Sequence, residues 1–236
     1  MAGALSGKIA LVTGGNRGIG FAIAKALIGE GATVIITARD LQKLNSALES
    51  LGSNAQAVAC DVREEASVSQ AFARVQEDFG KLDILVNNAG IAGPAGKIEK
   101  LSYADWRDVV DTNLSGLFLV TRSALPLLSS GATIVNNISI AAKTIFPGMA
   151  AYNASKYGAL GFTESLREEV RPRGIRVVSL MPGAVDTEIW QQFWPQAPRK
   201  KMMSADSIAR ATLTAILMPE GTAMQEIAIA PTAGKL

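Results

Sequence analysis

The chain of 236 residues carries 23 Lys and Arg against 21 Asp and Glu, which gives a formal net charge of +2. This near-neutral balance without a long charged run excludes nucleic acid as the expected partner, and an apolar content of 48% argues against disorder. The chain has no histidine, so any acid–base chemistry must use another side chain.

Cysteine use, hydropathy and the N-terminal segment indicate where the protein works. The single cysteine, Cys60, cannot form an internal disulfide, and no apolar stretch reaches the roughly 18 residues of a membrane span. The N-terminal segment lacks the charged start and apolar region of a signal peptide. We therefore expect a cytoplasmic protein with no membrane partner. Without histidine or an acidic cluster at ligand spacing, we also expect no metal site.

Short apolar runs alternate with longer helical patterns along the whole chain. Strands are predicted at 9–13, 33–37, 55–60, 84–86, 132–138, 176–181 and 226–230, the first six of them buried. Helices are predicted at 19–30, 41–51, 65–79, 104–128 (one helix or two), 152–170 and 205–217, with Asp40 and Ser204 as N-caps. This alternation predicts an α/β fold with a doubly wound parallel sheet of about seven strands, flanked by helices on both faces, in a single domain spanning 1–236.

A glycine-rich turn follows the first predicted strand and opens the first helix. Its backbone would approach an anion closely, and the helix N-terminus would offer unpaired N–H groups to a pyrophosphate. The alternative is a turn that needs glycine only for its backbone angles. Four of the eight residues 13–20 are glycines, which favours the dinucleotide site, with these candidate binding residues: Gly14, Asn16, Arg17, Gly18, Ile19 and Gly20.

The end of the second predicted strand bears on which dinucleotide binds. An NAD site usually places an acidic side chain there for the ribose hydroxyl, but this chain has Ala38 followed by Arg39. Arginine suits a 2′-phosphate, and Arg17 in the turn would supply a second cation. The sequence thus favours NADP(H). A shift of one residue would instead make Asp40 the ribose ligand.

Tyr152 and Lys156 stand four residues apart, with Ser139 upstream. On a helix, positions i and i+4 share a face, so the phenol and the ammonium would point the same way. The cation would lower the pKa of the tyrosine and make it a proton donor and acceptor near neutral pH. The alternative is a half-exposed aromatic ring beside a solvated lysine.

Taken in order along nearly the whole chain, these motifs resemble those of the short-chain dehydrogenase/reductase family, whose fold is of the Rossmann type. The resemblance implies that Asn113, Ser139, Tyr152 and Lys156 are the catalytic set, with Asn113 anchoring a water that relays protons to Lys156. It also implies that Tyr152 and Lys156 contact the cofactor, together with these residues: Asp61, Val62, Asn88, Ala89, Gly90, Pro182, Gly183, Val185 and Thr187.

The implied activity is NADP(H)-dependent hydride transfer between a small-molecule carbonyl and the corresponding alcohol, in a homodimer or homotetramer. Ser139 would hold the carbonyl oxygen, Tyr152 would act as general acid and base, and Lys156 would lower the tyrosine pKa and hold the nicotinamide ribose. Two alternatives are a 3-oxoacyl thioester reductase acting on acyl carrier protein or coenzyme A substrates, and a non-catalytic NADP-binding sensor. The C-terminus lacks the Val-Asp-Gly-Gly ending of many relatives, which weighs against the thioester reductase.

The segment 184–204, which we call the lid segment, occupies the place of the family's substrate lid. Its large apolar side chains either line an apolar substrate pocket or pack the segment against its own domain or a second subunit: Trp190, Phe193, Trp194, Met202 and Met203. The run 199–201 of one arginine and two lysines is either solvated or steers an anionic carrier.

Overall fold

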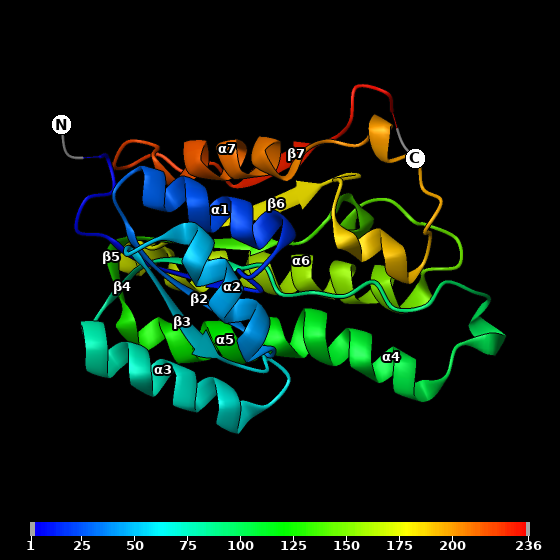
Figure 1. Cartoon of the computed structure of the whole chain (residues 1–236), viewed down its shortest axis with the longest axis horizontal. Helices are drawn as coiled ribbons and strands as arrows, with labels where there is room; N and C mark the ends of the chain where they lie inside the picture. The colour runs from blue at the N-terminus through cyan, green and yellow to red at the C-terminus, as the bar shows by residue number, and fades with distance from the viewer. Residues whose placement is uncertain (1–2, 235–236) are drawn as a thin grey trace.

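The computed structural model describes residues 3–234, and within them seven parallel strands form one sheet with the order β3-β2-β1-β4-β5-β6-β7 (Figure 1). The α/β doubly wound fold predicted from the sequence is confirmed. The strands are β1 (Ile9–Thr13), β2 (Thr33–Ala38), β3 (Ala55–Ala59), β4 (Leu82–Asn87), β5 (Leu128–Asn137), β6 (Arg176–Pro182) and β7 (Glu226–Ile229).

Helices cover both faces of the sheet (Figure 1). One face packs against α1 (Gly18–Gly29), α2 (Leu41–Leu51) and α7 (Ala205–Ile216). The other packs against α3 (Glu65–Phe79), α5 (Gly116–Ala124) and α6 (Ala150–Val170), and α4 (Tyr103–Val110) contacts α6. The strand order reverses between β1 and β4, and open α/β sheets bind ligands at the carboxyl ends of their strands at such a point.

The predicted helix 104–128 extends too far. Helix α5 ends at Ala124, a 3₁₀ turn follows at Leu125–Leu127, and strand β5 already begins at Leu128. Pro126 lies in that turn, and its ring and missing N–H end the helix. Between α4 and α5, residues Asp111–Ser115 form one π-helical turn that contains Asn113.

The structure also tests the predictions of buried strands, of two helix N-caps and of the absence of a membrane span. Strand β3 is only partly buried, contrary to the prediction, because it lies at the edge of the sheet, whereas β1 in the middle is fully buried. Asp40 caps α2 and Ser204 caps α7, as predicted. Over residues 3–234, none of the helices combines the length and the apolar character needed to cross a lipid bilayer.

Candidate active site

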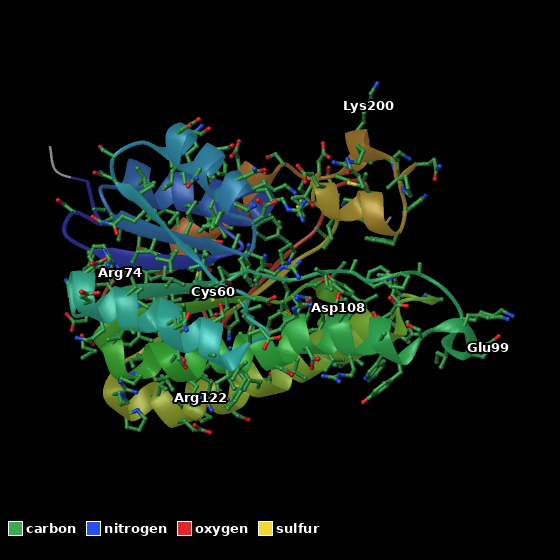
Figure 2. All side chains as sticks on the ribbon, turned by 60° about the horizontal axis from the view of Figure 1, so that its bottom comes forward. Cys60, Arg74, Glu99, Asp108, Arg122 and Lys200 are labelled. Carbon is green, nitrogen blue, oxygen red and sulfur yellow. The ribbon has the colours of Figure 1, made fainter. Side chains whose placement is uncertain are left out.

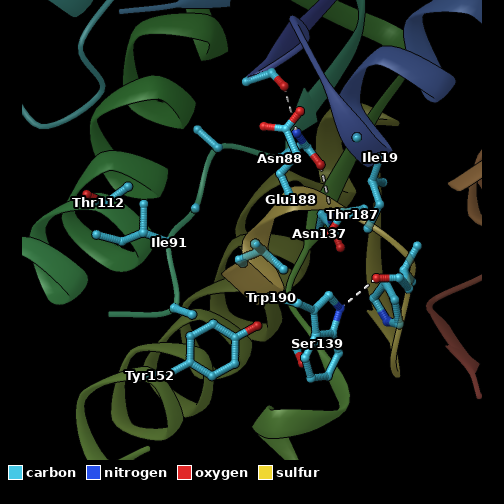
Figure 3. Close-up of a pocket in the computed structure, with 18 of the residues that line it drawn as sticks. Ile19, Asn88, Ile91, Thr112, Asn137, Ser139, Tyr152, Thr187, Glu188 and Trp190 are labelled. Carbon is cyan, nitrogen blue, oxygen red and sulfur yellow. Dashed lines mark hydrogen bonds between the residues drawn. The ribbon is translucent and has the colours of Figure 1, made fainter. Parts of the chain in front are cut away.

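A cleft of about 710 Å³ opens at the carboxyl ends of the strands, and this volume is within the range of small-molecule and cofactor sites. Ile19 and Asn88 lie toward one end of it, and Ser139, Tyr152 and Trp190 lie toward the other (Figure 3). We call these the glycine-turn end and the tyrosine end.

The side chain of Asn88 holds the glycine turn in place through hydrogen bonds to its backbone. The Nδ2 atom of Asn88 donates hydrogen bonds to the carbonyl oxygens of Thr13 (2.9 Å) and Gly14 (3.2 Å). A Cβ atom at position 20 would lie 2.4 Å from that nitrogen, so only glycine fits there. Gly14 has φ +62°, which also favours glycine. The turn is therefore built for close backbone approach, and Gly20 acts behind it, outside the cleft lining.

The end of β2 and the first turn of α2 place three charged side chains on the cleft wall: Arg39, Asp40 and Lys43. Asp40 accepts hydrogen bonds from the backbone N–H groups of Gln42 and Lys43, and the Lys43 bond is the main cause that lowers its pKa. Lys43 also lies 3.6 Å from Asp40 as an ion pair, whereas Arg39 has no carboxylate partner among residues 3–234. The carboxylate at this strand end is thus committed to capping α2. Lys43 is a second cation of this wall that the sequence analysis missed.

Asp61 and Val62 line the cleft after β3, as the resemblance implies. The guanidinium of Arg63 binds the Asp61 carboxylate at 2.6 Å and is the main cause that lowers the pKa of Asp61. Asp61 therefore presents a fixed, ionised carboxylate beside the cleft.

Arg17 and Glu188 form an ion pair that joins the glycine turn to the lid segment, 171 residues away in the chain. The methyl group of Thr187 would lie 3.3 Å from a Cβ at Gly18, so the lid segment also approaches the turn closely. The side chain predicted to be a second phosphate-binding cation thus contacts the lid segment.

Ser139 has a strained backbone. Its φ of 147° and ψ of 159° fall in a region that side-chain-bearing residues rarely adopt, and such strain clusters at functional sites. Its Oγ accepts a hydrogen bond from the N–H of Ala141 at 3.1 Å. The Ser139 side chain also acts on the Tyr152 phenol and opposes the rise in the tyrosine pKa described next.

Tyr152 and Lys156 lie on one face of α6, as predicted, with Lys156 Nζ 5.5 Å from the centre of the Tyr152 ring. The predicted direction of the Tyr152 pKa is wrong for this structure. Burial disfavours the phenolate and raises the pKa. Burial also disfavours the ammonium and lowers the pKa of Lys156 to about 8. Lys156 stays mostly protonated at pH 7, but its charge is not among the causes that shift the pKa of Tyr152, and burial dominates.

Asn113 lies behind the cleft lining. Its Oδ1 accepts from the N–H of Ile91 and its Nδ2 donates to the carbonyl of Ile91, both at 2.9 Å. Nδ2 also donates to Ser155 Oγ (3.0 Å), which in turn donates to the Tyr152 carbonyl (2.8 Å). Asn113 therefore connects the wall at Ile91 to the helix that carries Tyr152. The sequence analysis missed Ser155, although it lies inside the Tyr-Asn-Ala-Ser-Lys stretch.

Asn137 links the two ends of the cleft, and the sequence analysis missed it too. Its Nδ2 donates to Asn88 Oδ1 at 2.8 Å, and its carbonyl accepts from Lys156 Nζ at 3.4 Å. A continuous chain of hydrogen bonds thus runs from the glycine turn through Asn88 and Asn137 to Lys156.

Nearly all the sequence-predicted site residues meet in this one cleft. Its lining includes the following: Gly14, Asn16, Arg17, Gly18, Ile19, Arg39, Asp61, Val62, Asn88, Ala89, Gly90, Ser139, Tyr152, Lys156, Pro182, Gly183, Val185 and Thr187. Of the predicted residues, only Gly20 and Asn113 lie outside this lining. Each contacts a residue that does line it: Gly20 lies against Asn88, and Asn113 accepts a hydrogen bond from Ile91. Over residues 3–234, no group of three or more cysteine, aspartate or glutamate side chains is arranged to hold a metal ion.

The lid segment lines the cleft and also packs on itself. The Trp190 ring centre lies 5.1 Å from that of Phe193 and 6.1 Å from that of Trp194, and all three rings line the cleft. Met202 and Met203 do not line it; Met203 packs against the core beside α7 instead. The two ends of the segment are joined where Asp186 N–H donates to the Met203 carbonyl at 2.8 Å.

Comparisons with known proteins identify the family. The profile of the short chain dehydrogenase family matches residues 8–198. The chain belongs to this family. It is 38% identical over 189 residues to a 3beta-hydroxysteroid dehydrogenase of Mediterraneibacter gnavus, covering 78% of this chain and 68% of the relative.

Two further relatives cover more of the chain. A 3-oxoacyl-(acyl-carrier-protein) reductase of Aquifex aeolicus is 35% identical, covering 89% of this chain and 90% of the relative. The crystal structure of a short chain dehydrogenase of Burkholderia cenocepacia in complex with NADP superposes with a TM-score of 0.86 at 35% identity, covering 96% and 97% of the two chains. The family and its oxidoreductase class are thus established for this chain.

Proposed function

We propose that this oxidoreductase is an NADP(H)-dependent carbonyl reductase or alcohol dehydrogenase. The observation that carries the proposal is that Ser139, Tyr152 and Lys156 line the same cleft as the glycine turn. Acid–base groups and a dinucleotide cradle within one cleft suit hydride transfer coupled to proton transfer.

The residues present fit an NADP(H) molecule. The glycine turn offers close backbone approach at the N-terminus of α1, and the NADP complex of the Burkholderia relative supports this placement. At the end of β2, Arg39 and Lys43 offer positive charge, while Asp40 is used in capping. This set favours a 2′-phosphate over a free ribose hydroxyl.

The bound cofactor supplies or accepts the hydride, and the chain supplies the rest. Ser139 hydrogen-bonds the substrate oxygen and holds it beside the phenol of Tyr152. Tyr152, kept protonated by its raised pKa, donates its proton to that oxygen during reduction and takes it back during alcohol oxidation. Lys156 holds hydroxyl groups of the cofactor near Tyr152, and Asn113 positions Ile91 on the opposite wall.

A second candidate, a 3-oxoacyl thioester reductase, is favoured by the Aquifex relative. In this chain Arg199 of the basic run pairs with Asp186, which leaves Lys200 and Lys201 for an anionic carrier. The assembly into a homodimer or homotetramer, and the cytoplasmic location, stay predictions from the family resemblance.

The test is a titration of the purified protein with NADPH and NADH, followed by nicotinamide fluorescence, and turnover with ketones, aldehydes and acetoacetyl thioesters. Tighter binding of NADPH with turnover of simple carbonyls is the expected result. A preference for NADH would assign the ribose to Asp40. Binding without turnover of any carbonyl would favour the sensor, and thioesters as the only substrates would favour the second candidate.

A further inference from the structure

The tyrosine end of the cleft has an unusual division of charge. Of the charged side chains that line the cleft, four lie at the glycine-turn end: Arg39, Asp40, Lys43 and Asp61. Arg17 and Glu188 neutralise each other as an ion pair. Lys156 is the one charged group beside Tyr152 in this lining, and its site is desolvated.

The walls beyond Tyr152 are apolar on both sides. The lid segment contributes the rings of Trp190, Phe193 and Trp194, and the facing loop contributes Phe146 and Met149. The indole nitrogen of Trp190, Nε1, already donates to the Val185 carbonyl at 2.8 Å. The wall thus offers aromatic surface and few free hydrogen-bond donors.

These walls are also held in place. Asn153, which follows Tyr152 on α6, donates from Nδ2 to the Phe146 carbonyl at 2.9 Å. The Trp190 hydrogen bond and the backbone pairing at Met203 hold the opposite side. An apolar molecule would therefore meet a preformed surface, and ordering costs on binding would be low.

The basic side chains of the lid segment are not placed to pair with an anionic group beside this aromatic wall. Arg199 pairs with Asp186, and Lys200 points away from the molecule (Figure 2). Neither of these two side chains lines the cleft, nor does Lys201. A carboxylate or phosphate carried past Tyr152 would be desolvated without a partner, and that cost is high.

Building on the proposed function, we infer that the substrates are uncharged carbonyl compounds whose reacting carbon bears a bulky apolar or ring group. The ring group lies against Trp190 and Phe193, while the oxygen lies at Ser139 and Tyr152. Small ketones leave the aromatic wall uncovered, and anionic keto acids are rejected by it.

The test compares three ketones with the purified enzyme and NADPH: methyl 4-acetylbenzoate, the corresponding carboxylate 4-acetylbenzoate, and 2-butanone. Acetoacetyl coenzyme A is measured beside them as a charged thioester. The ester and the acid have nearly the same shape and differ in charge, and butanone lacks the ring. We expect kcat/KM for the ester to exceed that of each of the other two by about tenfold or more. Equal or higher values for the acid, for butanone or for acetoacetyl coenzyme A would overturn the inference.

Two variants locate the effect. Phe193→Ala should lower kcat/KM for the ester about tenfold and for butanone less than about threefold, because only the ester uses the ring surface. Trp106→Phe, on α4 and outside the cleft, is the control that should change neither. An equal loss on both ketones in Phe193→Ala would assign that ring a structural role and contradict the inference.

A binding measurement separates this inference from the proposed function. The ester should quench tryptophan fluorescence of the wild type, and Trp190→Phe should lose most of that quench while still binding NADPH. If no carbonyl is turned over, the proposed function fails, whatever the ester does. If carbonyls are turned over, but the ester neither quenches the tryptophan fluorescence nor has the highest kcat/KM of the ketones, only the substrate inference fails.

Discussion

The two ends of the cleft are built from different kinds of contact. At the glycine-turn end, the Asn88 amide, the Thr13 carbonyl and the glycine backbone fit one another through directional hydrogen bonds. At the tyrosine end, rings of the lid segment pack against each other at 5.1–6.1 Å. Directional contacts require particular residues at particular spacing, whereas many apolar sequences can fill the same volume.

This difference separates cofactor affinity from substrate choice. Substitutions at the glycine-turn end should change dinucleotide binding, and substitutions in the lid rings should change which carbonyl is accepted. Substitution of the Tyr152 phenol, at the tyrosine end, should affect turnover without strongly affecting either kind of binding.

The largest expected effect is that of Tyr152→Phe. It removes the only proton donor proposed for the substrate oxygen, so kcat should fall by about 10³-fold, within the range typical of general acid–base groups. The dissociation constant for NADPH should stay within about twofold, because the ring and its packing remain. Steady-state kinetics and fluorescence titration measure the two quantities.

Tyr157→Phe is the matched control for this variant. Tyr157 lies on the same helix but is 43% exposed and does not line the cleft. It should retain wild-type turnover. If Tyr152→Phe also keeps its turnover, another group carries the proton and the proposed mechanism is wrong.

The sequence predicts the strands and the polar end of the cleft because each signal there is local. The apolar run of β1, the glycines after it and the Asp40 cap all follow from neighbours within a few residues. Predicting the shared cleft needs only the rule that parallel strands end on one side of the sheet.

What the sequence could not show depends on distant packing. Arg17 meets Glu188 across 171 residues, and Asn137 meets Asn88 across 49. The neighbouring Lys156 alone predicts a lowered pKa for Tyr152, but burial, which depends on the whole fold, dominates and raises it. The helix end at Ala124 is within reach of sequence reasoning, since Pro126 follows it almost directly.

Protein stability should depend on pH through Lys156. Its pKa is about 8 in the fold against 10.5 for an ordinary lysine, so between these values the unfolded chain binds more protons. Stability should therefore rise with pH in that window, by about 2 kcal/mol from about pH 7.5 to 9.5. The raised pKa of Tyr152 reverses the trend only above about pH 10, where unfolded tyrosine ionises.

Urea unfolding of the protein without cofactor measures this dependence. Lys156→Met keeps the length of the side chain and removes the titrating group, so its stability should be nearly flat over the same range. A wild type that is equally flat would show that Lys156 stays hydrated, and desolvation would then no longer explain the raised pKa of Tyr152 beside it.

At the glycine-turn end, Arg39→Ala should raise the dissociation constant for NADPH by about 10- to 30-fold, the equivalent of one charge-assisted hydrogen-bonding group. The constant for NADH should change less than about twofold, because it lacks the 2′-phosphate. Arg74→Ala on α3, whose guanidinium pairs with Asp78, is the control for removing a surface charge. Equal losses for both dinucleotides would place Arg39 away from the 2′-phosphate.

The smallest expected effect concerns the ion pair between Arg17 and Glu188, which joins the glycine turn to the lid segment. Glu188→Gln breaks the Arg17 pair, whose side chains are 47% and 58% exposed, so little stability is lost. Arg17 then becomes free for a cofactor phosphate, and NADPH should bind about two- to fivefold more tightly, with a smaller gain for NADH. Glu99→Gln lies in the 3₁₀ turn Ile98–Lys100, which projects from the molecule (Figure 2), and it does not line the cleft; it removes the same charge and should change neither constant. Weaker NADPH binding in Glu188→Gln would instead mean that the pair holds the lid segment over the bound cofactor, so that the two ends of the cleft work as one.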